Sequence, residues 1–298
     1  MVSVGNLTLG GTGKTPLVEW LAHWFCERGV RVALISRGYG ARSGTANDEA
    51  LELAEKLPGV PHLLDADRVR AAERAVREHE ARLILLDDGF QHRRLFRDLD
   101  IVLVDALEPL GFGHVFPRGT LREPLAGLGR AQAVVLSRAD LLDAAARAAL
   151  HGELSQYAPQ AAWIEAAHAP RTLVSAAGKT EAVESLAGRS IAAFCGIGNP
   201  AAFRATLERC GYRLAAWREF PDHHRYGSED VQALSAWAAG LDVSAVICTQ
   251  KDLVKLTSSQ LAGKPLWALS IGLEILTGQE QLEKLLSPLV ERSRETGE

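Results

Sequence analysis

Residues 2–16, VSVGNLTLGGTGKTP, decide the fold, because they lead from an apolar run through a glycine-rich loop into a helical pattern. The run at 2–7 predicts a strand, and the apolar spacing from Pro16 to Arg28 predicts a helix that ends at Gly29. Glycines in such a loop let backbone N–H groups surround phosphate oxygens without clashes from Cβ atoms. A Gly-Lys-Thr ending between a strand and a helix is the context of a P-loop. The predicted phosphate site consists of Thr8, Leu9, Gly10, Gly11, Thr12, Gly13, Lys14 and Thr15.

Two residues of this loop are expected to act directly on a nucleoside triphosphate. In a P-loop the lysine, here Lys14, reaches the β- and γ-phosphates, and the hydroxyl of the following residue, here Thr15, binds Mg²⁺. Lys14 is therefore also a candidate catalytic residue. Thr8 stands where the strict pattern has glycine, so a glycine-rich loop with an incidental lysine is the alternative. The motif predicts triphosphate and Mg²⁺ binding and leaves open what happens to the γ-phosphate.

A P-loop needs carboxylates for its metal, and the apolar run LILLDD at 83–88 supplies them. Asp87 and Asp88 end a predicted strand, where a carboxylate can hold Mg²⁺ directly or through water. Adjacent residues of a strand point to opposite faces, so the two side chains are not expected to do the same job. Both are metal candidates, with a turn or helix cap as the alternative for the one that points away.

Apolar runs alternate with helical patterns along the first half of the chain. The runs at 83–88, 100–106 and 133–137 are nearly continuous, which is typical of parallel strands buried on both faces. The alternation predicts an α/β fold with a P-loop NTPase-like, doubly wound, mostly parallel sheet.

A second, smaller α/β lobe is expected, because SIAAFCGIG at 190–198 and SAVICT at 244–249 have the pattern of further strands. The expected division is a nucleotide-binding domain at 1–160, a linker at 161–185 and a C-terminal lobe at 186–298. Two short strands, WIEAAHAP and RTLVS, are predicted for the linker, and an amphipathic helix at 279–293 ends the chain.

The composition narrows the class of protein. Of 298 residues, 47% are hydrophobic and 23% are charged, the balance of a globular chain. A net charge of −4 gives no general basic surface, so nucleic acid is not an expected partner. No apolar run reaches the roughly 18 residues of a membrane span, and the first residues lack the basic region of a secretory signal. Four scattered cysteines suit a reducing compartment, so we expect a cytoplasmic protein.

Several motifs then follow one another along the chain: SVGNLTLGGTGKTP, LISRGYG at 34–40, DDGFQHRRLFRDLDIVLVDA at 87–106, LREP at 121–124, FPDHHRY at 220–226 and TQKDLVKL at 249–256. In this combination, over nearly the whole chain, the sequence resembles the tetraacyldisaccharide 4′-kinases, the lipid A 4′-kinases of Gram-negative bacteria. The resemblance implies ATP and Mg²⁺ as cofactors and an acylated glucosamine disaccharide 1-phosphate as the acceptor. It implies phosphorylation of the acceptor's 4′-hydroxyl to give lipid IV-A, by an enzyme that is peripheral at the cytoplasmic face of the inner membrane.

The resemblance also assigns site residues. It implies a catalytic pair, Asp48 in NDEA and His223 in DHHRY, and a Glu123 near the metal in LREP. A carboxylate within reach of a hydroxyl can accept its proton, and an imidazole can orient that carboxylate. From the residues alone, each of the pair is explained as the cap of a helix that follows it. The candidate substrate residues are Arg37, Gln91, His92 and Arg122. Arg37, in SRGYG, is a candidate phosphate clamp, with a solvated arginine at a strand end as the alternative.

Some alternatives stay open. TQKD at 249–252 resembles the guanine-reading NKxD signature, as 137–140 does more loosely, and this would favour GTP; the resembling family uses ATP, so ATP is expected. A nucleotide-switched P-loop ATPase or GTPase of the metallochaperone or partition type is the alternative function, and a kinase of a soluble sugar is a third. The apolar segment 107–116 mildly favours a lipid-facing loop, with packing inside the protein as the alternative.

The resembling family carries an N-terminal segment with an amphipathic helix, whereas this chain begins inside the first strand. Its membrane contact is therefore expected to differ, or its start to lie upstream. The sequence leaves the oligomeric state open.

Overall fold

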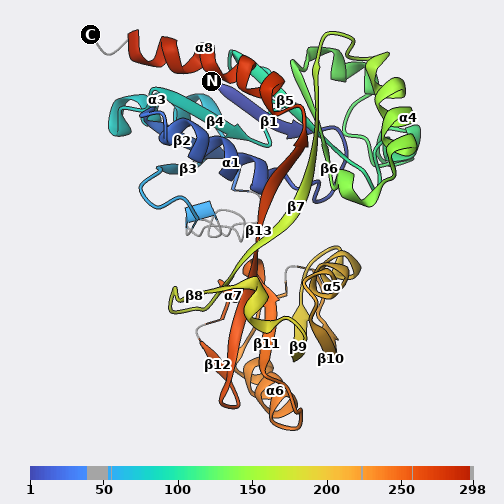
Figure 1. Ribbon diagram of the computed structural model, residues 1–298. Coiled ribbons are helices and arrows are strands. Elements are labelled where there is room, and N and C mark those ends of the chain that lie inside the picture. Colours follow the sequence, from blue (N-terminus) through green and yellow to red (C-terminus); the bar gives the residue numbers. More distant parts are fainter. Residues whose placement is uncertain (39–52, 55, 223, 257, 296–298) are drawn as a thin grey trace. The chain divides into compact units, whose positions relative to one another are not determined.

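The computed structural model describes residues 1–38, 53–54, 56–222, 224–256 and 258–295, and the chain forms two compact units (Figure 1). The first unit contains Met1–His168 and Leu273–Glu298, and the second contains Ala169–Gly272. The chain passes between them twice, in the long strands β7 (Ala162–Val174) and β13 (Lys264–Thr277).

A parallel sheet forms the centre of the first unit. Its strands run in the order β7-β6-β5-β1-β4-β2-β3, and each neighbouring pair is parallel. Besides β7, they are β1 (Val2–Asn6), β2 (Val32–Ser36), β3 (His62–Leu64), β4 (Leu83–Asp87), β5 (Leu99–Asp105) and β6 (Ala133–Ser137). Parallel neighbours need crossover connections, which helices commonly supply. The described α-helices of this unit are α1 (Lys14–Cys26), α3 (Arg68–His79), α4 (Ala144–Ser155) and α8 (Gln279–Glu295).

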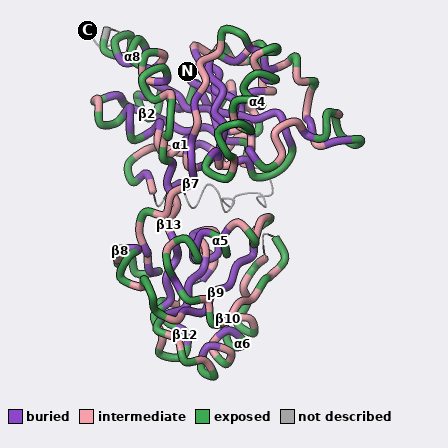
Figure 2. The backbone as a smooth tube through the Cα atoms, turned by 45° about the vertical axis from the view of Figure 1, so that its right-hand side comes forward, coloured by how far each residue is buried: buried purple, intermediate pink, exposed green. Residues whose placement is uncertain are grey.

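Helices cover both faces of this sheet, because successive side chains of a buried strand point to opposite faces. The core on one face joins the strands to α1 and α8, and includes Val4, Leu85, Leu21, Phe25 and Leu286. The cores on the other face join them to α3 and α4, and include Ile35, Leu86, Ala71, Leu136 and Leu150. Figure 2 shows the buried residues concentrated along the strands. Burial of such side chains contributes about 25 cal/mol per Å² of apolar surface.

The phosphate loop lies at the carboxyl edge of the sheet. Because β1, β4, β5 and β6 are parallel, their carboxyl ends share one edge, where ligands of open α/β sheets bind. Polar residues end these strands: Asn6, Asp87, Asp105 and Ser137. The edge therefore gathers hydrogen-bonding side chains around residues 7–13.

The second unit has its own parallel strands, in the order β10-β9-β11-β13. They are β9 (Ser190–Cys195), β10 (Arg213–Glu219), β11 (Ala245–Thr249) and the first part of β13, with short antiparallel additions β8 (Thr180–Ala182) and β12 (Gln260–Leu261). The helices are α5 (Pro200–Arg209), α6 (Ser228–Ala239) and α7 (Gln250–Leu253). Short 3-10 helices span Gly111–Gly113, Leu125–Arg130 and Ala139–Leu141 in the first unit and Val183–Leu186 in the second. The predicted fold class, a mostly parallel α/β sheet with a second α/β unit, is confirmed.

Residues 162–174 form one continuous strand, where two short strands were expected. The boundary between the two expected strands falls just after Pro170. This proline lies between the part of β7 that pairs with β6, at Ala162–Glu165, and the part that pairs with β8, at Thr172–Val174. Pro170 thus lies outside the residues that pair with β6 and with β8, and the strand continues through it.

The C-terminal segment also differs from the expectation that 186–298 form one lobe. Residues 264–277 form β13, a strand that the sequence did not predict, and Leu273–Glu298 group with the first unit. The apolar face of α8 explains why this segment groups with the first unit. Leu282, Leu286 and Leu289 recur at helical spacing and are buried in the same core as α1.

Candidate active site

The loop between β1 and α1 has the geometry of a phosphate cradle. Gly10 and Gly13 adopt left-handed backbone conformations, with φ of 104° and 85°, which glycine reaches without steric cost. Gly13 caps α1, and a Cβ atom at this position would lie 2.3 Å from Nε2 of His168. The helix therefore starts directly behind the loop, where its free N–H groups and partial positive charge favour an anion. The buried hydroxyl of Thr12, within the loop, has no hydrogen-bond partner among the described residues.

Lys14, Asp88 and Arg122 form a charged cluster beside the loop. The ammonium of Lys14 lies 3.5 Å from Oδ1 of Asp88 and donates to Oδ1 of Asn6 at 3.3 Å. Nη1 of Arg122 donates to both carboxylate oxygens of Asp88, at 2.7 and 2.8 Å. Burial acts to raise the pKa of Asp88, but the charges and hydrogen bonds of Lys14 and Arg122 outweigh it, so the pKa lies below its usual range. Asp88 is therefore ionised at neutral pH.

The segment Thr120–Glu123 holds the first half of the loop in place. The backbone N–H of Leu9 donates to the carbonyl of Thr120 at 2.7 Å, and the backbone N–H of Arg122 donates to the carbonyl of Leu7 at 2.6 Å. Nε of Arg122 also donates to the carbonyl of Thr8, at 3.1 Å. Arg122, expected as a substrate residue, thus ties the LREP motif to the loop and to Asp88.

Glu123 belongs to a second network on the same segment. Its Oε1 accepts from Nε2 of Gln91 at 3.0 Å and from Nη2 of Arg130 at 2.8 Å. The amide of Gln91 also donates to Asn6 O at 3.0 Å, at the end of β1. Gln91 and Glu123, from two separate motifs, are therefore brought together at the base of the P-loop.

The oxygen ligands expected for Mg²⁺ occupy this edge of the sheet. Thr15 is the second residue of α1, Asp87 is the last residue of β4, and both are buried. Asp88 follows the strand in a left-handed conformation, with φ of 52°, so the two aspartates have different environments. A hydroxyl and carboxylates are the hard oxygen donors that Mg²⁺ prefers, so the donor types fit this ion. Within the described part of the chain, however, no three carboxylate, histidine or cysteine side chains are grouped so that they could hold a metal ion.

Arg68 is a site residue that the sequence reasoning missed. It is the first residue of α3, and its side chain is 7% exposed. Its buried Nε atom has no hydrogen-bond partner in the part of the chain that the structure describes. Burial and the charge of Arg37 lower the pKa of Arg68, and the charges of Asp88 and Asp87 oppose this shift.

The same arginine acts on His92. Burial lowers the pKa of His92, and so do the positive charges of Arg68, Arg94 and Arg97. Arg37, Arg68 and His92 are thus electrostatic neighbours.

The catalytic pair implied by the resemblance, Asp48 and His223, lies outside the described residues. The residues that follow His223 are held firmly in the second unit. His224 contacts Asp230 at 3.2 Å, and the hydroxyl of Tyr226 donates to Oδ1 of Asp252 at 2.9 Å.

Asp252, in the TQKD motif, is engaged within its own unit. Its carboxylate accepts from the backbone N of Gly196, at 3.1 and 3.2 Å, and from the hydroxyl of Thr249, at 2.7 Å, and it is fully buried. The resemblance of TQKD to a guanine-reading signature is therefore explained by local hydrogen bonding. The motif gives no support to GTP.

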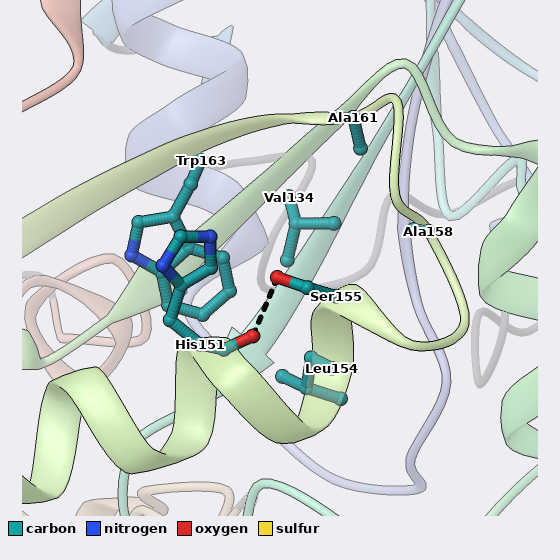
Figure 3. A pocket seen from close by; sticks show the side chains of 7 residues that line it. All are labelled: Val134, His151, Leu154, Ser155, Ala158, Ala161 and Trp163. Atoms are coloured by element: carbon teal, nitrogen blue, oxygen red, sulfur yellow. Dashed lines mark hydrogen bonds between the residues drawn. The ribbon is translucent and has the colours of Figure 1, made fainter.

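A small cavity lies away from the loop, between α4 and the strands β6 and β7. His151 stacks on Trp163 there, with ring centroids 4.6 Å apart, and Ser155 donates to the carbonyl of His151 (Figure 3). Its volume of about 10 Å³ accommodates roughly one water molecule, which is too little for a substrate. Among the described residues, no helix is both long and apolar enough to cross a bilayer.

A glycine-rich loop at the carboxyl edge of a parallel sheet, with a lysine and two aspartates beside it, defines an α/β P-loop nucleotide-binding protein. Comparison with known proteins narrows this class to one family. The family described as Tetraacyldisaccharide-1-P 4'-kinase matches residues 1–291. The chain belongs to this family, which is a family of kinases. This membership does not favour the alternative function, a nucleotide-switched P-loop ATPase or GTPase.

Individual relatives agree with this assignment. The chain is 40% identical to the tetraacyldisaccharide 4'-kinase of Anaeromyxobacter dehalogenans, over 96% of this chain and 81% of the relative. It is 38% identical to that of Desulfatibacillum aliphaticivorans, over 97% of this chain and 83% of the relative. Among solved structures, LpxK from Aquifex aeolicus, in an "apo" form in complex with ATP, superposes with a TM-score of 0.77 at 28% identity, covering 97% of this chain and 88% of that one.

Proposed function

We propose that this chain transfers the γ-phosphate of ATP to the 4′-hydroxyl of an acylated glucosamine disaccharide 1-phosphate, which gives lipid IV-A. The observation that carries the proposal is the joining of Lys14, Asp88 and Arg122 around the P-loop, in a chain that matches the 4'-kinase family over residues 1–291. ATP is chosen over GTP because the Aquifex aeolicus relative was solved with ATP.

In this proposal the P-loop binds the phosphates of ATP. Backbone N–H groups of residues 10–15 and the start of α1 surround the β- and γ-phosphates. Lys14 supplies a positive charge where negative charge is spread over the transferring group. Its ammonium already lies beside Asp88 and Asn6, which limits its freedom before the nucleotide binds.

Thr15 and Asp87 would hold Mg²⁺, with Asp88 and Glu123 as further candidate ligands. When bound, this ion neutralises charge on the β- and γ-phosphate oxygens. Asp88 is kept ionised by Lys14 and Arg122, so its carboxylate is in the form that a metal ligand needs.

The reaction forms a bond between the γ-phosphorus and the 4′-oxygen and breaks the bond to the bridging oxygen of the ADP leaving group. Asp48 accepts the hydroxyl proton, and His223 is proposed as the residue that orients or activates it. A positioned base of this kind contributes typically about 10²–10⁴-fold. Both assignments come from the resemblance of NDEA and DHHRY to the family motifs.

A cationic group is proposed to bind the anionic part of the disaccharide. Arg37 and His92, together with Arg68, are neighbours around the two aspartates. The unpaired Nε of Arg68 is a buried donor, and a guanidinium suits the planar geometry of phosphate oxygens. In this structure Gln91 donates a hydrogen bond to Glu123, and Arg122 donates one to Asp88. These two donors are proposed to support the site from behind the substrate.

Membrane contact is proposed through the segment that follows β5. Leu107, Phe112, Val115 and Phe116 are 40–71% exposed there, and Leu9 in the P-loop is 45% exposed. The segment is joined to the loop by the pairing of Thr8 with Leu121. Apolar side chains at the edge that binds phosphate suit an enzyme that is peripheral at the cytoplasmic face of the inner membrane.

The deciding experiment is a kinase assay with the purified chain, Mg²⁺, γ-labelled ATP and tetraacyldisaccharide 1-phosphate in detergent micelles, with GTP in a parallel reaction. We expect a labelled bisphosphorylated lipid from ATP. A folded chain that binds ATP but forms no labelled lipid contradicts the proposed function, and equal labelling from GTP contradicts the choice of nucleotide.

A further inference from the structure

We propose that Ser137 and Arg138, at the carboxyl end of β6, are positioning residues that orient two successive P-loop peptides toward the nucleotide phosphates. The proposal rests on the proposed function only in that the P-loop binds a nucleotide. It assigns a role to the 137–140 turn other than reading the base.

The first observation is a pair of hydrogen bonds from this turn to adjacent carbonyls of the loop. Ser137 Oγ, in a fully buried residue, donates to Thr12 O at 2.7 Å. Nη2 of Arg138 donates to Gly11 O at 3.1 Å. Both donors are 125 or more residues away from their acceptors in sequence, so the contacts are built by the sheet and not by local chain geometry.

These bonds determine where the loop's N–H groups point. A peptide unit is planar and trans, so its C=O and N–H are directed oppositely. The bond to Gly11 O therefore turns the N–H of Thr12 away from β6, and the bond to Thr12 O does the same for the N–H of Gly13. Successive N–H groups that point to one side form an anion-binding concavity. The left-handed conformation of Gly13, with φ of 85°, completes this arrangement.

The second observation is that Arg138 is itself fixed. Its Nη1 pairs with Oδ2 of Asp105, the last residue of β5, and both side chains are about 15% exposed. Oδ1 of Asp105 in turn accepts from Leu107 N at 3.1 Å. Arg138 also has a left-handed backbone, with φ of 56°, which is uncommon outside glycine, asparagine and aspartate. A chain of contacts thus runs from the end of β5 through Arg138 to the P-loop.

The test measures binding affinity for ATP and for tripolyphosphate, which has the phosphates but no base, in Ser137→Ala, Arg138→Ala and Arg138→Lys. A lysine retains the charge but cannot bridge Asp105 and Gly11 with a fixed fork of donors. We expect each variant to bind both probes about 5–10-fold more weakly, which corresponds to roughly one net hydrogen bond. In the kinase assay, the KM for ATP rises while the KM for the lipid is unchanged.

Matched controls remove bonds of the same kind elsewhere in the first unit. Ser155→Ala removes a serine bond to the carbonyl of His151, and Arg28→Ala removes an arginine bond to the carbonyl of Trp24. Both controls are expected to bind the probes as the unmodified chain does, even where they lower the melting temperature.

Unchanged affinity in the Ser137 and Arg138 variants overturns the proposal. Weaker binding of ATP with unchanged binding of tripolyphosphate also overturns it, because the turn would then read the base. An unmodified chain that binds neither probe overturns this proposal together with the proposed function. A chain that binds both probes but phosphorylates no lipid contradicts only the latter.

Discussion

Nη1 of Arg122 donates to both carboxylate oxygens of Asp88, while Nε of the same side chain donates to the carbonyl of Thr8 at 3.1 Å. One guanidinium therefore joins the LREP segment, the end of β4 and the P-loop. This relationship links a candidate metal ligand to the phosphate site, and it makes a direct prediction about nucleotide binding.

Arg122→Lys should raise the KM for ATP by about tenfold, because lysine cannot donate in a fixed fork to two partners. The melting temperature should fall only slightly, since Asp88 keeps its contact with Lys14. Arg118→Ala, at an exposed arginine shortly before the LREP segment, is the control and should leave the KM unchanged. The KM is measured by steady-state kinetics at varied ATP concentration. An unchanged KM in Arg122→Lys would show that the bidentate contact with Asp88 is dispensable.

Lys14→Ala should lower kcat by about 10²–10³-fold or more, the usual loss when one charge-stabilising group is removed from a transition state. Folding should be little affected, because the ammonium makes only a weak contact with Asn6 and a 3.5 Å contact with Asp88. Lys179→Ala, an exposed lysine of the second unit that pairs with Glu181, serves as control. A Lys14→Ala enzyme with a near-normal rate would remove the P-loop assignment.

His168 predicts a pH dependence of stability. Burial first, and the charge of Arg138 next, lower its pKa to about 4, whereas an unfolded histidine titrates near 6.5. As pH falls from about 6.5 toward 4, the unfolded chain takes up a proton that the folded chain does not. Folding stability is therefore lost over this interval, by about 2–3 kcal/mol for this group.

The measurement for His168 is urea unfolding at pH 7 and pH 4.5. His168→Gln, which does not titrate, should lose less stability between the two values than the unmodified chain. His114→Gln, at a histidine that is only partly buried, should behave like the unmodified chain. If His168→Gln and the unmodified chain lose the same stability, the histidine is not held neutral beside Gly13.

The P-loop, the strands of the first unit other than β7 and the carboxylates at 87–88 were predictable, because their signals are local. A period of two or an unbroken apolar run fixes a strand, and glycines before Lys14 fix the loop. The roles of Arg68 and Ser137 were not predictable in this way. Arg68 looks like any charged residue at a helix start, and only the packing of α3 on the sheet buries it. The bond from Ser137 to Thr12 spans 125 residues of chain.

The end of the chain shows the same limit. The sequence predicted the helix at the C-terminus but placed it in the second lobe, because neighbours in sequence are usually neighbours in space. The sequence shows that α8 has an apolar face, but it does not show which apolar surface of the protein that face packs against. Its actual partner is the core around α1, which depends on β13 returning to the first unit.

Asp48→Ala should lower kcat by about 10²–10⁴-fold, the usual contribution of a positioned base, and leave the affinity for ATP nearly unchanged. The prediction follows from the assignment of Asp48 as proton acceptor. Asp48→Asn keeps the size and the capping ability of the side chain, so it separates the two explanations of this residue. Single-turnover kinetics with bound ATP give the comparison. An active Asp48→Asn enzyme would return Asp48 to the role of a helix cap.

Leu286→Ala tests the membership of α8 in the first unit. Leu286 is fully buried in the core that contains Leu21 and Leu85, so its truncation should destabilise that unit by about 2–5 kcal/mol. Hydrogen exchange followed by mass spectrometry locates the effect, since amides of β1 and β5 should exchange faster while those of β9 and β11 do not. Leu234→Ala, buried equally in the core of the second unit, should give the reverse pattern. Faster exchange in β9 and β11 on truncation of Leu286 would mean that α8 stabilises the second unit, because a cavity loosens first the strands that the missing side chain packed against.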